Sequence, residues 1–196
     1  AAFLALGLSA ASDAPVAVVC TSGSAVANFH PAAVEARFNH RRVVFLTANR
    51  PPEMDGVGAQ QTIVQRGIFA HDVVSELVMT PAGPEINSEE DSLGWNAHWR
   101  SALCRIMTQS AISAGPIHID VPFREPLVPP TESPAVSPAV LPLLPAPWQG
   151  RRDGQAWTQY VPNYTLDLSR RTVVIAGQGS WEIPALAGVP TLCEPG

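Results

Sequence analysis

Short apolar runs alternate with longer segments of helical periodicity along this chain. The runs at residues 16–19 and 43–46 are continuously aliphatic or aromatic, which is typical of strands buried on both faces of a parallel sheet. The pattern predicts four strands in the first two thirds of the chain, at residues 16–19, 43–47, 73–79 and 116–122. The strand at 73–79 is predicted at a sheet edge. Helical segments separate the strands, so the pattern predicts an α/β fold with a parallel sheet.

Four helices are predicted, at residues 1–11, 24–38, from Gln60 or Gln61 to Phe69, and 93–111. In the first, large apolar residues are expected to supply the buried side: Phe3, Leu4, Leu6 and Leu8. Pro31 is expected either to kink the second helix or to mark its true first turn. The last helix carries an apolar stripe at four-residue steps, made of Trp95, Trp99, Leu103 and Met107.

In the strand at residues 116–122, alternation of period two places His118 and Asp120 on one face. None of the five histidines has the spacing of a metal or catalytic motif, so each is interpreted as structural or solvent-facing.

Proline content divides the chain. Eight prolines fall between Pro126 and Pro147, which predicts an extended linker with polyproline character. We therefore expect an α/β domain over residues 1–125, a Pro-rich linker over 126–150, and the start of a second α/β domain over 151–196. A strand and glycine turn at 171–179 would open that second domain. The first helix has no N-cap residue before it and the chain ends without a closing element, so an internal fragment of a longer protein is expected.

Charge and cysteine content narrow the class of protein. The formal net charge of -5 argues against nucleic-acid binding and against an anionic membrane surface. No apolar run approaches the ~20 residues needed to span a bilayer. Cys20, Cys104 and Cys193 have neither metal-type nor C-x-x-C spacing, so no metal site is predicted and a reduced, cytoplasmic compartment is favoured.

Candidate chemistry gathers where two predicted strands end. The first strand runs into a polar turn, residues 20–24, that contains Gly23. The second runs into a loop with Arg50, two adjacent prolines, two glycines and the amides of Gln60 and Gln61. Ligands of open α/β sheets bind beyond the carboxyl ends of the strands. A guanidinium and neutral amides in such a loop suit a planar anion such as a carboxylate.

Simpler interpretations of these residues stay open at this point. Ser22 or Ser24 could cap the helix that follows the turn. Arg50 could be a surface residue paired with Glu53 or Asp55. Residues 177–179 contain only the first part of a dinucleotide-binding fingerprint, so a tight strand-to-helix turn is the simpler explanation there.

Several segments resemble one family. They are CTSGSAVANFHP at 20–31, LTANRPPE at 46–53, GAQQTI at 58–63 and GPIHIDVP at 115–122. Together they are similar to the pyrimidine-binding domain of thiamine-diphosphate enzymes. Within that superfamily they resemble the 2-succinyl-5-enolpyruvyl-6-hydroxy-3-cyclohexene-1-carboxylate (SEPHCHC) synthase family of menaquinone biosynthesis. The segment around Arg50 is the specific part, whereas the Ser-Gly turn is shared across the superfamily.

The resemblance implies a transferase that decarboxylates 2-oxoglutarate and adds the resulting carbanion equivalent to isochorismate. Thiamine diphosphate, held by Mg²⁺, would supply the electron sink, in a site between two subunits of a homo-oligomer. Arg50 matches the arginine that contacts substrate carboxylates, and Gln61 matches a glutamine near the covalent intermediate. Four residues match the turn around the aminopyrimidine ring: Ser22, Gly23, Ser24 and Asn28.

The same resemblance implies that parts of the site lie elsewhere. The family's essential glutamate would precede Ala1, and the segment that binds Mg²⁺ and diphosphate would lie far downstream, so this fragment alone is expected to be inactive. Two alternatives remain. One is another thiamine-diphosphate lyase, of the acetohydroxyacid-synthase type, which the Arg-Pro-Pro-Glu loop disfavours. The other is a non-catalytic nucleotide-binding module resting on residues 177–179.

Overall fold

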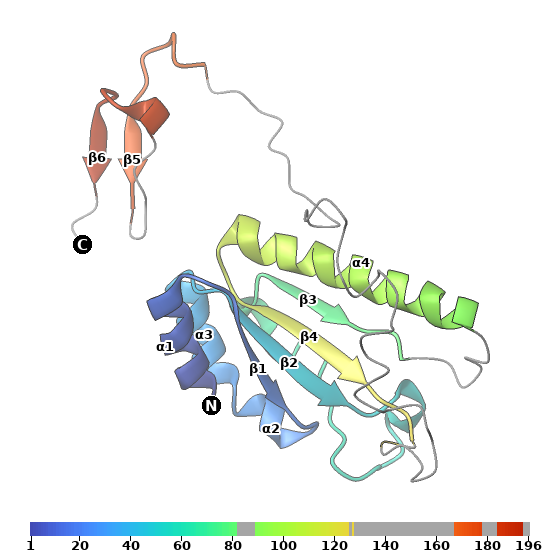
Figure 1. The fold of residues 1–196 in the computed structure, drawn as a ribbon. Coiled ribbons are helices and arrows are strands. Elements are labelled where there is room, and N and C mark those ends of the chain that lie inside the picture. The colour runs from blue at the N-terminus through green and yellow to red at the C-terminus, as the bar shows by residue number, and fades with distance from the viewer. Residues whose placement is uncertain (82–88, 126, 128–166, 178–183, 194–196) are drawn as a thin grey trace. The chain divides into compact units, whose positions relative to one another are not determined.

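A computed structural model describes residues 1–81, 89–125, 127, 167–177 and 184–193. Its contacts divide the chain into two units, Ala1–Tyr160 and Val161–Gly196. The first unit contains a four-stranded parallel sheet in the order β1-β2-β4-β3 (Figure 1). Its strands are β1 Val16–Cys20, β2 Val43–Asn49, β3 Ser75–Val78 and β4 Ile117–Pro122. The predicted α/β class and the edge position of β3 are confirmed.

Helices cover both faces of this sheet (Figure 1). On one face, α1 (Ala2–Ser12) and α3 (His30–Phe38) contribute alanines to a core with Val18, Val43 and Phe45. On the other face, α4 (Glu89–Ser113) packs its apolar side on β2, β3 and β4. The predicted helix at 93–111 is confirmed and extends further at both ends. Leu103 and Met107 of its stripe contact the core, and Trp99 Nε1 donates to the carbonyl of Thr80 at 2.8 Å.

Small residues face the sheet from α1, contrary to expectation. Ala2, Ala5 and Ser9 are buried, whereas Phe3, Leu4 and Leu8 are exposed; Leu6 packs against the core. The buried positions follow the spacing i, i+3, i+7 of one helix face. The predicted buried side was therefore wrong for three of its four residues.

The predicted helix at 24–38 consists of two helices. A short α2 spans Ser24–Ala27, and α3 begins at His30 with Pro31 in its first turn. Proline is tolerated there because the first N–H groups of a helix have no intrahelical acceptor. Pro31 therefore marks a true first turn, which was one of the two expectations.

The helix predicted from Gln60 or Gln61 to Phe69 is wrong. Turns and irregular backbone occupy these residues, and a single 3₁₀ turn, η2 (Ala70–Asp72), follows them. Gln61 and Gly67 have φ values of 56° and 72°, which an α-helix does not accommodate. The contacts of Gln61 and Gln65 described below explain this conformation.

The second unit contains a parallel pair of short strands, β5 (Val174–Ala176) and β6 (Thr191–Cys193), with η6 (Pro184–Leu186) between them in sequence. The strand predicted near 171–176 is confirmed. Residues 178–179 of the glycine turn and most of the Pro-rich segment 126–150 lie outside the described residues. The domain boundaries therefore stay predictions. Among the described helices, none combines the length and apolar character needed to cross a bilayer.

Candidate functional site

The carboxyl ends of three neighbouring strands bring the predicted site segments to one edge of the sheet. In the register of the sheet, Cys20 pairs with Thr47, and Thr47 pairs with Asp120. β2 ends at Asn49, opposite Pro122 of β4. The turn after β1 and the loop after β2 therefore leave the sheet from the same edge, as the sequence predicted.

The Ser-Gly turn after β1 is docked on Gln61. Ser22 Oγ donates to the carbonyl oxygen of Gln61 at 3.0 Å. In return, Gln61 Nε2 donates to Thr21 Oγ1 at 2.9 Å and to the carbonyl of Ser22 at 3.0 Å. A Cβ atom on Gly23 would lie 2.9 Å from Gln61 Cγ, and the φ of Gly23 is +83°. Both the close approach and the positive φ require glycine at this position.

The helix-cap interpretation of this turn is wrong. The N-cap residue of α2 is Gly23, and no side chain caps that helix within the described residues. Ser22 is buried and bonded to Gln61 instead. Ser24 and Asn28 are exposed, so they leave a hydroxyl and an amide at the surface next to the turn.

Arg50 follows β2 directly and is half-buried. Its backbone N–H donates to Asn49 Oδ1 at 2.8 Å. Its guanidinium forms no hydrogen bond or ion pair with any residue of the described part of the chain. A cation placed at this edge with no partner in the described part of the chain is available to an anionic ligand.

The simpler interpretation of Arg50, a surface ion pair with Glu53 or Asp55, is wrong within the described residues. Glu53 binds Arg124 instead, with distances of 2.6 Å from Nε and 3.1 Å from Nη2. The hydrogen bonds from Arg124 lower the pKa of the Glu53 carboxyl. This pair links the loop after β2 to the segment after β4, and it leaves Arg50 uncompensated.

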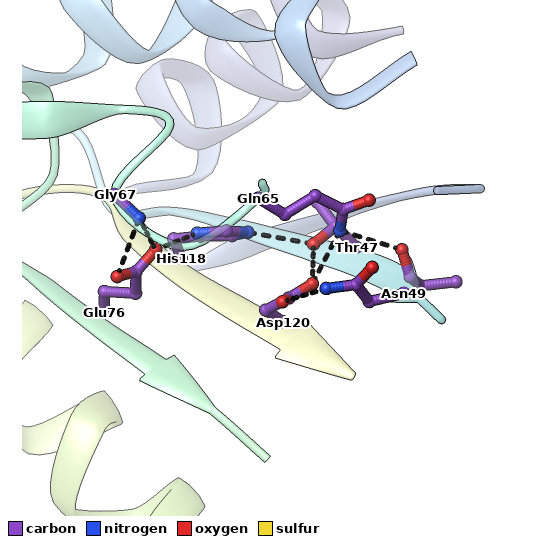
Figure 2. A network of polar contacts seen from close by, with 8 residues as sticks. Thr47, Asn49, Gln65, Gly67, Glu76, His118 and Asp120 are labelled. Carbon is purple, nitrogen blue, oxygen red and sulfur yellow. Dashed lines mark hydrogen bonds and ion pairs between the residues drawn. The ribbon is translucent and has the colours of Figure 1, made fainter. Parts of the chain in front are cut away.

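The buried side chain of Gln65 also contacts the Ser-Gly turn, from the interior of the domain. Its Oε1 accepts from the backbone N–H of Gly23 at 2.9 Å. Its Nε2 donates to the carbonyl of Ala48 at 3.0 Å and to Asp120 Oδ1 at 2.7 Å. The Gln65 side chain therefore joins β2, β4 and the turn after β1. Figure 2 shows its contact with Asp120. The irregular backbone of residues 60–69, with positive φ at Gln61 and Gly67, places Gln61 and Gln65 in these contacts.

Asp120 is 1% exposed and accepts from three side chains. Thr47 Oγ1 donates to Oδ1 at 3.0 Å, alongside Gln65, and Asn49 Nδ2 donates to Oδ2 at 2.7 Å (Figure 2). Burying a carboxylate is costly unless such donors satisfy it. The predicted placement of Asp120 on one face with His118 is confirmed.

His118 continues the chain of hydrogen bonds. Its Nε2 lies 2.9 Å from Thr47 Oγ1, and its Nδ1 lies 2.8 Å from Glu76 Oε1. Thr47 Oγ1 donates to Asp120 Oδ1 at 3.0 Å, so this hydroxyl lies between Asp120 and the His118 ring. Glu76 also accepts the N–H of Gly67 at 2.8 Å. We call this set the strand-end network: Thr47, Asn49, Gln65, Gly67, Glu76, His118 and Asp120 (Figure 2).

The sequence interpretation missed Thr47, Asn49, Gln65 and Glu76. A signal existed for Thr47, which shares a period-two face with the core residues Val43 and Phe45. A polar residue on a buried strand face needs a partner. Gln65 gave no such signal, because its partners lie 17, 42 and 55 residues away in sequence.

The charged and hydrogen-bonding side chains at this edge limit the kind of ligand that can bind there. No cluster of three or more His, Cys, Asp or Glu side chains suited to a metal ion occurs among the described residues. The described residues placed at this edge supply the guanidinium of Arg50, the exposed hydroxyl of Ser24 and the exposed amide of Asn28. This set fits a carboxylate next to a polar, uncharged ring.

Comparison with known proteins finds one domain model and one group of enzymes that the chain resembles. Residues 1–68 match the model of the thiamine pyrophosphate enzyme, N-terminal TPP binding domain. The whole chain is 45% identical to the SEPHCHC synthase of Rhodococcus jostii (strain RHA1) and 44% identical to that of Rhodococcus opacus (strain B4), and covers 35% of each. The corresponding enzyme of Mycolicibacterium vanbaalenii is 43% identical, again over the whole chain and 36% of the relative.

The chain thus spans about a third of the length of these curated relatives. The family model begins at residue 1 and extends through the Ser-Gly turn, Arg50 and Gln61 to residue 68. The parallel sheet, the glycine-dependent turn at its edge and the whole-chain similarity agree with one another. Over residues 1–68 the chain is therefore similar to the N-terminal TPP-binding domain of thiamine pyrophosphate enzymes, and over its whole length it is similar to SEPHCHC synthases.

Proposed function

We propose that this chain is part of a thiamine-diphosphate-dependent synthase that decarboxylates 2-oxoglutarate and adds the succinyl-semialdehyde carbanion equivalent to isochorismate, in cytoplasmic menaquinone biosynthesis. One arrangement at the ends of β1 and β2 carries the proposal. The turn that holds Ser22 and Gly23 is docked on Gln61, and Arg50 leaves the same sheet edge with no partner for its guanidinium among the described residues.

The cofactor side of the proposed site consists of Ser22, Gly23, Ser24 and Asn28. The absence of a side chain at Gly23 permits the turn to pack closely against Gln61, and this packing fixes the backbone that a flat ring would meet. The exposed Ser24 hydroxyl and Asn28 amide are neutral groups of the kind that hydrogen-bond an aminopyrimidine. Thiamine diphosphate supplies an electron sink when bound, and Mg²⁺ with the diphosphate would be held by residues beyond this chain.

The substrate side consists of Arg50 and Gln61. Both proposed substrates carry carboxylates, and a guanidinium binds a carboxylate through two parallel hydrogen bonds. The Gln61 amide is neutral, so it adds no charge beside a developing carbanion. Its Nε2 donates both protons to the turn, which fixes the amide and leaves Oε1 to accept a hydrogen bond from a donor on the bound ligand.

The proposed assembly is a homo-oligomer, because a cofactor bound by only part of its site here needs the remaining groups from elsewhere. In the family that this chain resembles, those groups come from a second subunit. A dimer or a tetramer satisfies this requirement equally.

Substituting Arg50 tests the proposal in the complete enzyme that carries this chain. For Arg50→Ala, we expect a loss of at least about 30-fold in kcat/KM for the carboxylate substrates, since a desolvated charge loses its partner. Arg50→Lys should recover only part, because a lysine lacks the planar fork. CO₂ release from 2-oxoglutarate and product formation with isochorismate are the measurements.

Arg41→Ala is the matched control. Arg41 precedes β2 and lies at the opposite end of the same strand, so its removal should leave kcat/KM unchanged. Unchanged rate and KM for both substrates in Arg50→Ala would remove Arg50 from the mechanism. Turnover of pyruvate in place of 2-oxoglutarate would favour the acetohydroxyacid-synthase type, and failure of the complete enzyme to bind thiamine diphosphate would refute the proposal.

A further inference from the structure

We propose that Asp120 is a positioning residue that fixes both halves of the site, the turn on the cofactor side and the Arg50 loop on the substrate side. The inference rests on the proposed function. It assigns no contact with substrate or cofactor to Asp120, which acts through Gln65 on one side and Asn49 on the other.

The first connection runs from Asp120 to the cofactor side. Asp120 Oδ1 accepts from Gln65 Nε2 at 2.7 Å, and Gln65 Oε1 accepts from the N–H of Gly23 at 2.9 Å. Gln65 is 1% exposed, so no bulk water competes for these bonds. The amide of Gln65 has its donor side fixed by Asp120 and Ala48, and this orientation directs its oxygen at the turn.

The second connection runs from Asp120 to the substrate side. Asp120 Oδ2 accepts from Asn49 Nδ2 at 2.7 Å, and Asn49 Oδ1 accepts from the N–H of Arg50 at 2.8 Å. Asp120 fixes the donor side of the Asn49 amide, and this orientation directs the Asn49 oxygen at the N–H of Arg50. The carbonyl of Asn49 also accepts from the N–H of Phe123 at 3.0 Å, which holds the end of β2 to the end of β4.

Only a carboxylate satisfies both connections. Asp120 receives donors at both oxygens, from Gln65 and Thr47 at Oδ1 and from Asn49 at Oδ2. An asparagine at this position would direct an N–H₂ group at one of these donors, because it has a single acceptor oxygen. Since the site is buried, the unmatched donors would lose their hydrogen bonds without gaining water. One or both connections must then reorient.

Single substitutions separate the two connections. Gln65→Glu keeps the acceptor for Gly23 and replaces the donor toward Asp120 by a second carboxylate oxygen. Asn49→Asp keeps the acceptor for the N–H of Arg50 and likewise replaces the donor toward Asp120 by a carboxylate oxygen. Asp120→Asn disturbs both. Ser110→Ala is the matched control, because the Ser110 hydroxyl is equally buried and donates to the carbonyl of Gly115 at 2.6 Å, before the amino end of β4.

The experiment measures two quantities in the complete enzyme: the Kd for thiamine diphosphate with Mg²⁺, by titration calorimetry without substrate, and the KM for 2-oxoglutarate at saturating cofactor. Gln65→Glu should raise the Kd about tenfold, with KM changing less than about twofold. Asn49→Asp should raise KM about tenfold, with Kd changing less than about twofold. Asp120→Asn should raise both quantities, and Ser110→Ala should raise neither although its thermal midpoint falls.

Two results would overturn the inference. In one, Asp120→Asn folds and retains wild-type Kd and KM. In the other, Ser110→Ala raises both quantities as much as Asp120→Asn, which would mean that general destabilisation explains the effect. If Asp120→Asn does not fold, the separate effects of Gln65→Glu and Asn49→Asp decide, since a purely structural role would move Kd and KM together. A wild-type enzyme that does not bind thiamine diphosphate would instead refute the proposed function.

Discussion

Successive side chains of the central strands β2 and β4 point to opposite faces of the sheet, and the two faces differ in chemistry. On the α4 face, Val44, Ile117 and Ile119 pack with Ile106 in an apolar cluster. On the opposite face, His118 lies beside Phe45 in the register, and the network continues toward the carboxyl ends of the strands through Thr47 and Asp120. His118 and Asp120 are as deeply buried as the aliphatic residues.

The difference shows that the two faces of one sheet have different roles: one stabilises the fold, and the other positions the loops of the site. Apolar burial contributes about 25 cal/mol per Å² and has no direction, so the α4 face stabilises without fixing any loop. Hydrogen bonds contribute little net free energy each, but they have direction and a large cost when broken in the interior. We therefore expect the α4 face to set the free energy of unfolding and the strand-end network to set the geometry of the site.

The largest expected effect is on the apolar face. Ile119→Ala should lower the free energy of unfolding by about 2–5 kcal/mol, because the residue is 3% exposed and its truncation leaves a cavity. Urea denaturation measures this change. The Kd for thiamine diphosphate of the folded protein should stay unchanged. Ile119→Val is the graded control, with an expected loss of about 0.5–1.5 kcal/mol. A weaker cofactor affinity without a loss of stability would contradict the comparison.

A smaller loss of stability, accompanied by a change in the site, is expected on the polar face. Thr47→Val conserves shape but removes the hydroxyl shared by Asp120 and His118, so it should cost about 1–3 kcal/mol. Cofactor affinity should fall as well, because Asp120 loses one of the donors that orient it. Thr47→Ser, which keeps the hydroxyl, should retain the affinity. Equal cofactor affinity for the valine and serine variants would show that the network does not position the turn.

The smallest effect concerns Cys20, at the end of β1. Burial raises the pKa of the Cys20 thiol, and the negative charge of Asp120 raises it further. A raised pKa lowers the thiolate fraction at any pH below it, so Cys20 should react with iodoacetamide more slowly at pH 8 than glutathione does. In Asp120→Asn, the rate should rise slightly, since burial is the larger cause. Mass spectrometry of the Cys20 peptide over a pH series measures this rate; a profile equal to that of glutathione would contradict the shift.

Much of the fold was predictable because the signals were local. Continuous apolar runs predicted β1 and β2, and alternation placed His118 and Asp120 on one face. The motif residues Ser22, Gly23, Arg50 and Gln61 were predicted at strand ends, and the structure brings Ser22, Gly23 and Gln61 into contact. The errors occurred where local pattern and tertiary contact disagree. A helix was predicted from Gln60 or Gln61 to Phe69, whereas the backbone there is irregular and Gln65 contacts β2, β4 and the turn.

The sequence by itself determined the α/β class, the strands and the strand-end position of the candidate residues, because hydrophobic periodicity and glycine chemistry depend on near neighbours. The tertiary structure alone decided which polar groups meet. Gln65, Thr47, Asn49 and Asp120 are separated by up to 73 residues, and their hydrogen bonds exist only once parallel pairing has aligned the ends of β2 and β4. Nothing local indicates such partners, since a buried polar side chain is satisfied by whatever the fold brings beside it.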